Sequence, residues 1–298
     1  MPERMWRCDP VLKWMKGYFM KREELTSIIK NFVSNSAGNV IPECDGMKIY
    51  DSSPLVGFAS ALDPLYSELK RQDIIGPHHW LPRDWVEGAK TVIAFFLPFT
   101  REVVESNYPE GMSSKEWYLA RYYGEEFNNA VRDQVVSTLQ RAGYQAVAPS
   151  RSEKFVMQAV TSNWSERHSA YISGLGTFCL SYSFITEKGC AGRYGTVVTD
   201  LELEPDRRTL GLRDNCLHDE NGTCGLCIPR CPAGAISAEK KDHGKCLEFL
   251  VTKVMAEQVP RYNIVVGGCG KCQTKVPCEF QIPKPIRKEY KSQGIKQP

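Results

Sequence analysis

The apolar and polar positions of the first 200 residues predict helices and strands that alternate along the chain. Residues 91–97 form an unbroken apolar run that ends at Pro98, which is typical of a strand buried at the centre of a sheet. From Phe127 to Leu139, large apolar residues recur every four positions, the spacing of one helix face. The longest helix is therefore expected over residues 113–142.

Shorter elements are predicted on either side of these two. Helices are expected over residues 23–34, where apolar residues share one face, and over residues 63–72. Residues 54–59 and 144–147 are predicted as short strands. The resulting β-α-β alternation makes the large domain α/β.

A further stretch, residues 163–203, predicts a short helix followed by two strands. The helix is expected to begin near Ser165, with Ser165 or Ser162 as its cap, and to end at residues 174–176. The strands are expected over residues 180–186 and 194–201 as a strand-turn-strand pair.

The two glycines of this stretch, Gly174 and Gly176, do not match a dinucleotide-binding fingerprint. No strand leads into them, and the position of the third glycine is occupied by Cys179. Two glycines this close would instead allow a flat ligand to approach the backbone.

The cysteines carry the strongest chemical signal. Eight of the twelve lie between positions 216 and 278, in two runs that loosely repeat the bacterial ferredoxin pattern C-x2-C-x2-C-x3-C-P. The first run consists of Cys216, Cys224, Cys227 and Cys231, with Pro232 directly after it. The second consists of Cys246, Cys269, Cys272 and Cys278. This spacing predicts two [4Fe–4S] clusters.

The fourth cysteine of each run is expected to bind the other cluster, because it lies too far along the chain to close its own. One cluster would then be held by Cys216, Cys224, Cys227 and Cys278, and the other by Cys231, Cys246, Cys269 and Cys272.

The alternative is a pair of zinc sites, since two C-x2-C pairs also occur in zinc ribbons. The Cys-Pro step and the eight ligands argue against zinc. The second run departs most from the pattern at Cys278. In the pattern a proline follows the last cysteine, whereas here Pro277 comes before it.

Length and composition indicate an ordinary globular protein. The chain has 298 residues, of which 42% are hydrophobic and 24% charged, enough for one large and one small domain. We expect a core over residues 1–204 with an N-terminal arm, a cluster domain over residues 205–283 and a basic tail over residues 284–298. The net charge of +3 is too small to indicate nucleic-acid binding by itself.

The compartment follows from the cysteines and from the absence of an export signal in this sequence. The N-terminal residues lack an apolar signal core, and the longest apolar run is far too short to span a membrane. Twelve cysteines without such a signal favour metal binding in a reducing compartment over disulfides. We therefore expect a cytoplasmic protein.

The chain resembles the epoxyqueuosine reductase and reductive dehalogenase superfamily in five segments that follow the family's order. These segments are PLVGFA, AKTVIAFFLPF, SERHSAYISGLGTF, VVTDLEL and the double cysteine run. The resemblance implies a nitroreductase-like α/β core that binds cobalamin, followed by a ferredoxin-like domain with two [4Fe–4S] clusters. It also implies base-off cobalamin with no protein histidine as lower cobalt ligand. The residues that would line the corrinoid face are Ser165, Glu166, Arg167, Gly174, Leu175, Gly176 and Thr177.

The resemblance further points to a proton donor. In epoxyqueuosine reductases a G-x-D-Y-H segment holds an acidic residue; the corresponding residues here, 124–128, read Gly-Glu-Glu-Phe-Asn. Glu126 is therefore the expected acid, with Tyr123 second, because a carboxyl beside an apolar macrocycle has a raised pKa and can donate a proton. Glu in place of Asp, and Asn128 in place of His, leave the tRNA substrate of that enzyme open here.

The expected function is a reductase that passes single electrons through two [4Fe–4S] clusters to cobalamin, for reduction of an epoxide, a halide or a similar electrophile. One alternative is a non-catalytic iron–sulfur carrier that reduces another corrinoid protein, and another is a zinc-dependent nucleic-acid module. Expected partners are a low-potential donor such as ferredoxin or flavodoxin, a small-molecule or tRNA-borne substrate, and a second copy of the chain. The remaining thiols, Cys8, Cys44, Cys179 and Cys190, are expected to be plain thiols.

Overall fold

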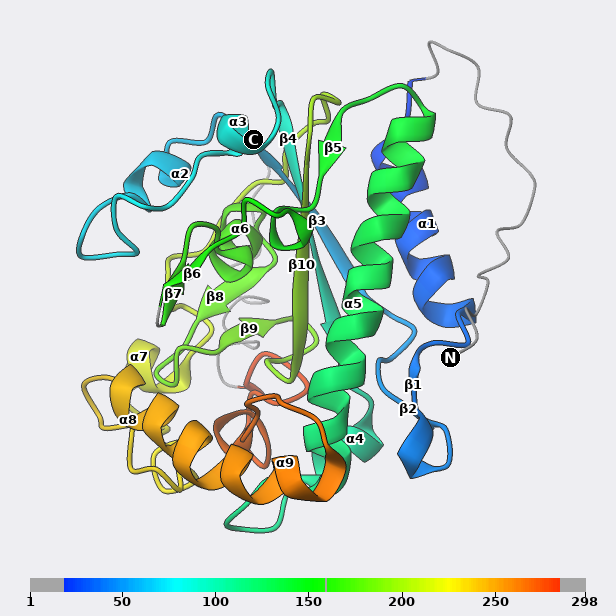
Figure 1. Ribbon diagram of the computed structural model, residues 1–298. Helices are drawn as coiled ribbons and strands as arrows, with labels where there is room; N and C mark the ends of the chain where they lie inside the picture. The colour runs from blue at the N-terminus through cyan, green and yellow to red at the C-terminus, as the bar shows by residue number, and fades with distance from the viewer. Residues whose placement is uncertain (1–18, 159, 285–298) are drawn as a thin grey trace.

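A four-stranded sheet forms the centre of the computed structural model, which describes residues 19–158 and 160–284 (Figure 1). The strand order is β3 (Leu55–Ser60), β4 (Thr91–Pro98), β10 (Gly192–Thr199) and β5 (Ala146–Val147), and every neighbouring pair is antiparallel. All eight residues of β4 are buried, as its unbroken apolar run requires. The prediction of a buried central strand at residues 91–97 is confirmed.

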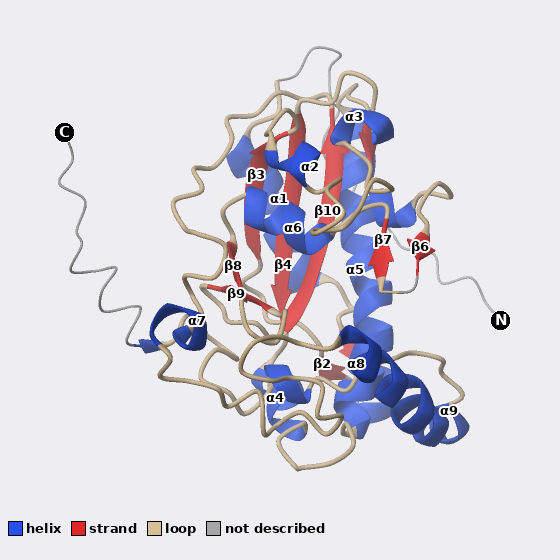
Figure 2. Ribbon diagram, turned by 90° about the vertical axis from the view of Figure 1, so that its left-hand side faces the viewer, coloured by secondary structure: helices blue, strands red, loops and turns tan. Residues whose placement is uncertain are grey.

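Helices cover both faces of this sheet (Figures 1 and 2). On one face lie α5 (Lys115–Arg141) and α1 (Arg22–Asn35), which pack against alternate residues of β4 such as Ile93 and Phe95. The other face is covered by α6 (Glu166–Ile172), α2 (Leu65–Glu68) and α3 (Pro82–Trp85). Because β4 is covered on both sides, the core extends through all three layers, and the α/β prediction is confirmed.

The longest helix, α5, has the bounds that its sequence predicts. Its N-terminal residue is capped by Ser114, whose hydroxyl accepts a hydrogen bond from the Trp117 amide at 3.1 Å. At the other end Gly143 has φ +92°, the left-handed conformation that stops helices. The four-residue stripe from Phe127 to Leu139 is buried in the core.

Two predictions about smaller elements are wrong. The strands expected as a pair over residues 180–186 and 194–201 belong to different sheets: β9 (Phe184–Thr186) pairs with β8 (Gly176–Phe178), whereas β10 pairs with β4 and β5. The turn after β9 is closed by Thr186 and Gly189, whose backbones exchange hydrogen bonds at 3.0 and 2.9 Å, and the following Cys190 amide donates to the Cys278 carbonyl at 2.9 Å. The helix expected over residues 63–72 is only the single turn α2.

The remaining elements are short. They are β1 (Val40–Ile41) with β2 (Met47–Lys48), α4 (Arg101–Ser106), β6 (Met157–Gln158) with β7 (Thr161–Ser162), α7 (Leu217–Asn221), α8 (His243–Phe249) and α9 (Ala256–Tyr262). A π-helical stretch, Leu250–Met255, joins α8 to α9. The short helix after Ser165 is confirmed as α6.

The cysteine-rich region lies at one end of the sheet, below the strands in Figure 1. Its helix α9 packs on the first half of α5, where the Tyr262 and Tyr118 rings lie 5.9 Å apart, and Val254 before it is fully buried. Over residues 205–284 the structure has one isolated bridge, Ile236 to Lys241, and no longer strand. This is consistent with a small ferredoxin-like domain without establishing one. The division into domains stays a prediction, and the arm and tail lie almost wholly outside the described residues.

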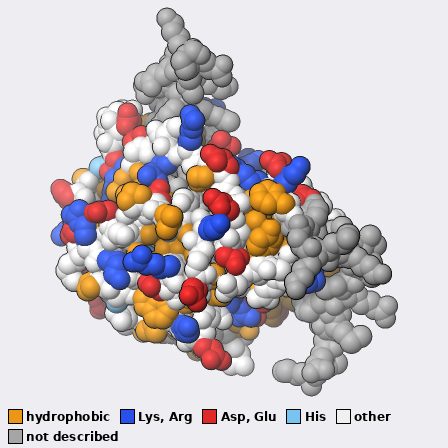
Figure 3. Space-filling model, turned by 90° about the horizontal axis from the view of Figure 1, so that it is seen from above, with side chains coloured by type: hydrophobic (Ala, Val, Ile, Leu, Met, Phe, Trp, Pro, Cys, Tyr) orange, Lys and Arg blue, Asp and Glu red, His pale blue; other side chains and the backbone are white. Residues whose placement is uncertain are grey.

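The surface is mixed in charge. The face in Figure 3 carries acidic and basic side chains interspersed with apolar ones, in keeping with the net charge of +3. Across residues 19–158 and 160–284, no helix is both long and apolar enough to cross a membrane.

Replacing Gly176 by Ala should destabilise the fold itself. An added Cβ would lie 2.1 Å from the Ile185 carbonyl oxygen, so β8 and β9 must move apart, and we expect a loss of about 1–3 kcal/mol. Thermal unfolding of cofactor-free protein measures this, with Gly267→Ala as control because its nearest atom is 3.8 Å away. An unchanged melting temperature in Gly176→Ala would contradict this packing role and favour the earlier expectation that Gly176 lets a flat ligand approach the backbone.

Candidate redox site

Five of the eight cysteines line one cavity at the end of the sheet, four of the first predicted group and Cys272 of the second. The four of the first group are Cys216, Cys224, Cys227 and Cys278, which the crossing rule predicts for one cluster. The cavity measures about 380 Å³, counted with its part open to solvent, and apolar residues such as Leu180, Ile185 and Val276 complete its wall. Thiols in an apolar cavity are the surroundings that an iron–sulfur cluster needs.

The other four cysteines lie close enough to influence one another. Burial, and the nearby thiols of Cys272 and Cys231, raise the pKa of Cys269 to about 11. Burial also raises the pKa of Cys272, to which the Cys246 and Cys231 thiols contribute. These are the four residues assigned to the second cluster. Their role as ligands stays a prediction, and among the residues described no three His, Cys, Asp or Glu side chains are grouped tightly enough for a single metal ion.

The two cysteine groups are adjacent. Cys272, of the second group, also lines the cavity of the first. Burial, and after it the thiols of Cys272 and Cys278, raise the pKa of Cys227 to about 12. Two redox centres placed here would therefore be neighbours.

Two further thiols, Cys179 and Cys190, lie beside the first group. Cys179 lines the cavity itself, with its Sγ 3.3 Å from the Ser183 carbonyl oxygen. The Cys190 Sγ is 3.8 Å from the Cys278 Sγ. Both are buried, as expected, but their closeness to the cluster cysteines has no signal in the spacing. Cys44 is half-buried, and Cys8 lies outside the described residues.

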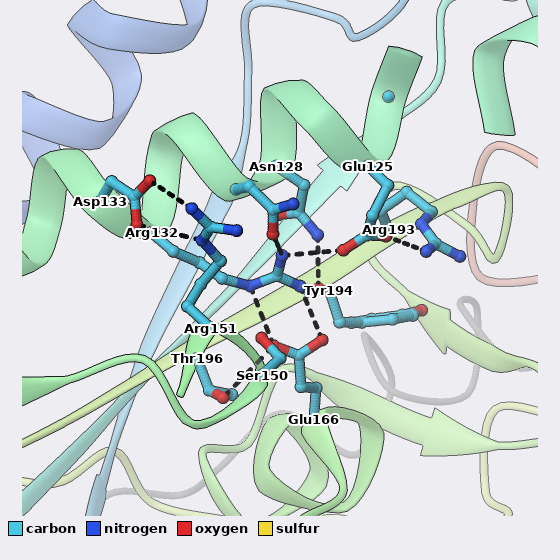
Figure 4. Close-up of polar contacts among 12 residues, drawn as sticks. Glu125, Asn128, Arg132, Asp133, Ser150, Arg151, Glu166, Arg193, Tyr194 and Thr196 are labelled. Carbon is cyan, nitrogen blue, oxygen red and sulfur yellow. Dashed lines mark hydrogen bonds and ion pairs between the residues drawn. The ribbon is translucent and has the colours of Figure 1, made fainter. Parts of the chain in front are cut away.

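A network of charged groups joins the sheet to the helices α5 and α6 (Figure 4). At its centre Arg132 of α5, with 1% of its side chain exposed, donates two hydrogen bonds to the Glu166 carboxylate at 3.1 and 2.8 Å. It also donates to Glu125 at 2.8 Å and to the Tyr194 carbonyl of β10 at 3.0 Å. One guanidinium thus connects α5, α6 and β10.

The ionisation of this network follows from its burial and its charges. Burial disfavours the charge on Arg132, but the carboxylates of Glu166 and Glu125 hold its pKa above the usual range. Burial raises the pKa of Glu166 against the attraction of Arg132. Arg132 therefore stays a cation, and Glu166 serves it as a bidentate acceptor.

Glu125 has several cationic neighbours. It accepts a short hydrogen bond from Arg193, and Arg121 lies 3.6 Å away. Although burial opposes its charge, Arg193, Arg132 and Arg121 hold the pKa of Glu125 well below its usual range. Glu125 is therefore an anion at neutral pH.

The seven residues expected on the corrinoid face are divided between two surroundings. Ser165 precedes α6, and its hydroxyl lies 2.7 Å from His168 Nδ1. Glu166 joins the charged network, and the exposed Arg167 donates to the Tyr182 carbonyl. Ser165, Glu166 and Arg167 thus lie at the N-terminal end of α6.

The other four are occupied by the protein's own packing. Gly174 has φ +71° and ends α6, and Leu175 packs against the cluster around Ala94. Gly176 is pressed against β9, and the buried Thr177 accepts a hydrogen bond from the Asn215 amide at 3.0 Å. The expectation that these residues line a corrinoid stays a prediction.

The two expected proton donors lie on α5. Glu126 is exposed, one position from Glu125, which carries the contacts with the arginines. The Tyr123 hydroxyl donates to Glu43, and burial and that carboxylate raise the pKa of Tyr123 to about 12. Their catalytic roles stay predictions. Sequence reasoning missed Glu125, Arg132 and Arg193, since nothing in the pattern tells which of two adjacent glutamates faces inward.

Comparison with known proteins shows distant homology to two groups of enzymes. The chain is 25% identical to an epoxyqueuosine reductase of Leadbetterella byssophila over 225 residues, which is 72% of this chain and 67% of the relative. It is 25% identical to that of Bacillus anthracis over 66% of this chain and 50% of the relative. A tetrachloroethene reductive dehalogenase of Desulfitobacterium hafniense is 32% identical over 53% of this chain and 26% of the relative.

Solved structures share the fold. A selenomethionine-labelled epoxyqueuosine reductase gives a TM-score of 0.51 at 19% identity, covering 89% of this chain and 69% of the other. A reductive dehalogenase described in terms of B12-dependent dehalogenation gives 0.52 at 18% identity, covering 80% and 31%. No family model matches the chain. The alignments with the Bacillus and Desulfitobacterium relatives span half of those proteins or less.

Removing Arg132 should cost far more stability than removing a similar arginine at the surface. Arg132→Ala leaves the half-buried Glu166 carboxylate without its cation and removes the link from α5 to α6 and β10, so we expect a loss of about 3–5 kcal/mol in the free energy of unfolding. Arg151→Ala is the matched control, because Arg151 pairs with the exposed Asp133 and such pairs contribute about 0–1 kcal/mol. Urea unfolding measures both, and equal losses would contradict the central role of Arg132.

Proposed function

We propose that this chain is an iron–sulfur, corrinoid-dependent reductase. It would take single electrons from a low-potential donor such as ferredoxin or flavodoxin and reduce an epoxide, a halide or a similar electrophile. The proposal is supported by the distant homology to epoxyqueuosine reductases and reductive dehalogenases. A cytoplasmic location and a homodimeric assembly belong to the same proposal.

The observation that carries it is the meeting of five of the eight cysteines around one cavity. Residues that are up to 62 positions apart in sequence, from Cys216 to Cys278, meet around one cavity without forming disulfides. The second group approaches the same cavity through Cys272. A structural disulfide framework would have no need of this arrangement, whereas two clusters that exchange electrons do.

When bound, the clusters supply single electrons and the corrinoid cobalt supplies the reducing centre. The chain's own residues hold and orient these groups. The four thiols of the first cavity and the four of the second would be the cluster ligands, in a site where Leu180, Ile185 and Val276 exclude water. Residues at the start of α6, Glu166 and Arg167, would lie beside the corrinoid.

The chain also has to supply a proton. Glu125 is held as an anion by its arginines and cannot serve as the acid at neutral pH. Tyr123 keeps its proton, since its pKa is raised to about 12. Glu126 is the carboxyl that the family segment assigns, and a substrate or partner bound over α5 would enclose it.

The substrate can be a small molecule or a group carried on tRNA. One of the fold relatives, an epoxyqueuosine reductase, was solved with a modified tRNA stem loop, at 17% identity to this chain and a TM-score of 0.51. The homologous dehalogenase is named for the small molecule tetrachloroethene.

The second candidate function is an electron carrier that reduces another corrinoid protein. Two observations favour it. Glu126 is exposed instead of enclosed, and Asn128, which stands where the family has His, is buried and donates to the Tyr194 carbonyl at 2.9 Å. Asn128 thus has a packing role in place of a catalytic one.

Anaerobic EPR of the iron-reconstituted protein with added cob(II)alamin distinguishes the two. A corrinoid reductase should show base-off cob(II)alamin together with [4Fe–4S] signals that dithionite reduces, because none of the five histidines lies in a known cobalt-binding pattern. Reducible clusters with cobalamin left in its free, base-on form would identify an electron carrier. Colourless protein that binds zinc would contradict both.

Replacing Cys278 should remove one cluster, whereas replacing its neighbour Cys190 should not. Cys278→Ser deprives the first group of its fourth ligand, so the iron content after reconstitution should fall by about half. Cys190→Ser is the matched control, since it changes a buried thiol 3.8 Å away. Iron and sulfide analysis measures both; if Cys190→Ser loses the cluster and Cys278→Ser retains it, the ligand assignment is wrong.

A further inference from the structure

The charged network has more positive than negative charge. Its cations are the guanidinium groups of four interacting arginines, Arg121, Arg132, Arg167 and Arg193. Its anions are the carboxylates of Glu125 and Glu166. Arg132 is fully engaged by the two carboxylates. Glu125 must then be shared between Arg121 and Arg193, which leaves an excess of two positive charges in a partly buried place.

The positive charges of these neighbouring arginines repel one another, and partial burial strengthens the repulsion. Burial, and then the charge of Arg193, lowers the pKa of Arg121 to about 10. Arginine normally keeps its proton under all conditions because its pKa exceeds 12. An anion bound among these groups would relieve the repulsion.

These arginines also have hydrogen-bond donors to spare. Arg193 Nε is buried and has no acceptor anywhere in the described part of the chain. Arg121 approaches Glu125 only to 3.6 Å, which is too long for a hydrogen bond. Arg167 uses one nitrogen, on the Tyr182 carbonyl. A buried N–H without a partner is rare in folded proteins and points to an acceptor that the protein itself does not provide.

A ligand can reach this place. The side chains of Arg121 and Glu125 are each 30% exposed, that of Arg193 is 24% exposed, and Arg167 is exposed. The guanidinium groups come from three elements, α5, α6 and β10, whose positions are fixed by the Arg132 hydrogen bonds (Figure 4). The donors are therefore held in place before any ligand arrives, which lowers the entropic cost of binding.

Arg167 lies next to the cysteine cavity. Arg167 donates to Tyr182, whose φ of +57° makes it one of four residues other than glycine with a left-handed backbone in the described segments. Tyr182 belongs to the loop that also carries Cys179 and Ser181, both of which line the cavity. Arg167 is within electrostatic range of Cys179 and Cys272. An anion held here would sit beside the redox centre.

We propose that Arg121, Arg167 and Arg193 form a binding site for an oxyanion, a phosphate or carboxylate group, carried by the ligand that the reductase binds. This rests on the proposed function and adds to it a chemical class of ligand. The oxyanion can belong to the substrate or to the nucleotide phosphate of the corrinoid, and the two sources share the same recognition chemistry.

Inorganic phosphate tests the site without any turnover. Titration calorimetry of the reconstituted full chain should detect phosphate binding, and Arg193→Gln and Arg121→Gln should each weaken it about tenfold or more, the usual effect of losing a charged hydrogen bond. Arg71→Gln is the control, because Arg71 is an exposed arginine that pairs with Asp73. Thermal unfolding verifies that each variant is folded. No phosphate binding, or equal weakening by Arg71→Gln, overturns the proposal.

Two corrinoids then identify the source of the oxyanion. Cobinamide has the corrin ring but lacks the nucleotide phosphate of cobalamin. If Arg193→Gln weakens cobalamin about tenfold and leaves cobinamide unchanged, the phosphate is that of the corrinoid. If both bind as before while phosphate binding is lost, the oxyanion belongs to the substrate. If the chain binds neither corrinoid but still binds phosphate through these arginines, the proposed function is refuted while the oxyanion site stands.

Discussion

The structure depends on one buried arginine. Arg132 has 1% of its side chain exposed and connects α5 to Glu166 of α6 and to the backbone of β10. A buried charge is stable only when its donors are satisfied, and here carboxylates and carbonyls accept from three of its nitrogens. Because these acceptors come from three elements, the Arg132 hydrogen bonds fix the orientation of α5, α6 and β10 relative to one another. Hydrophobic packing alone leaves that orientation less strictly defined.

Helix α5 carries that orientation to the cysteines. Its first half packs against the cysteine-rich region, where the Tyr118 hydroxyl donates to the Ile264 carbonyl at 2.7 Å and the Gly270 backbone lies directly against the Trp117 ring. Close by, the buried Lys271 donates to the Asn107 side chain at 2.9 Å, which ties the second cysteine run to the end of α4. Helix α5 thus connects the arginines to the second cysteine run.

The sequence was most informative where signals are local or chemical. The bounds of α5 and β4 follow from periodicity, and the clustering of cysteines distant in sequence around one cavity follows from their ferredoxin-like spacing. It failed where the outcome depends on partners distant in the chain. Residues 180–186 and 194–201 have strand composition, but their pairing is decided by β8, by β4 and by the Cys278 backbone. The charged network was invisible for the same reason.

The segment at residues 124–128 shows why a family resemblance does not transfer a role by itself. The Gly124 carbonyl accepts from the buried Tyr50 hydroxyl at 2.9 Å, Phe127 packs in the core, and Asn128 bonds to β10. Glu125 is committed to the arginines. Glu126 alone points outward, because each step along a helix turns the side chain by about a quarter of a revolution. The expectation of a proton donor presumed an apolar environment, and an exposed carboxyl acquires one only when a ligand or partner covers it. Catalysis by this segment therefore depends on what binds over α5.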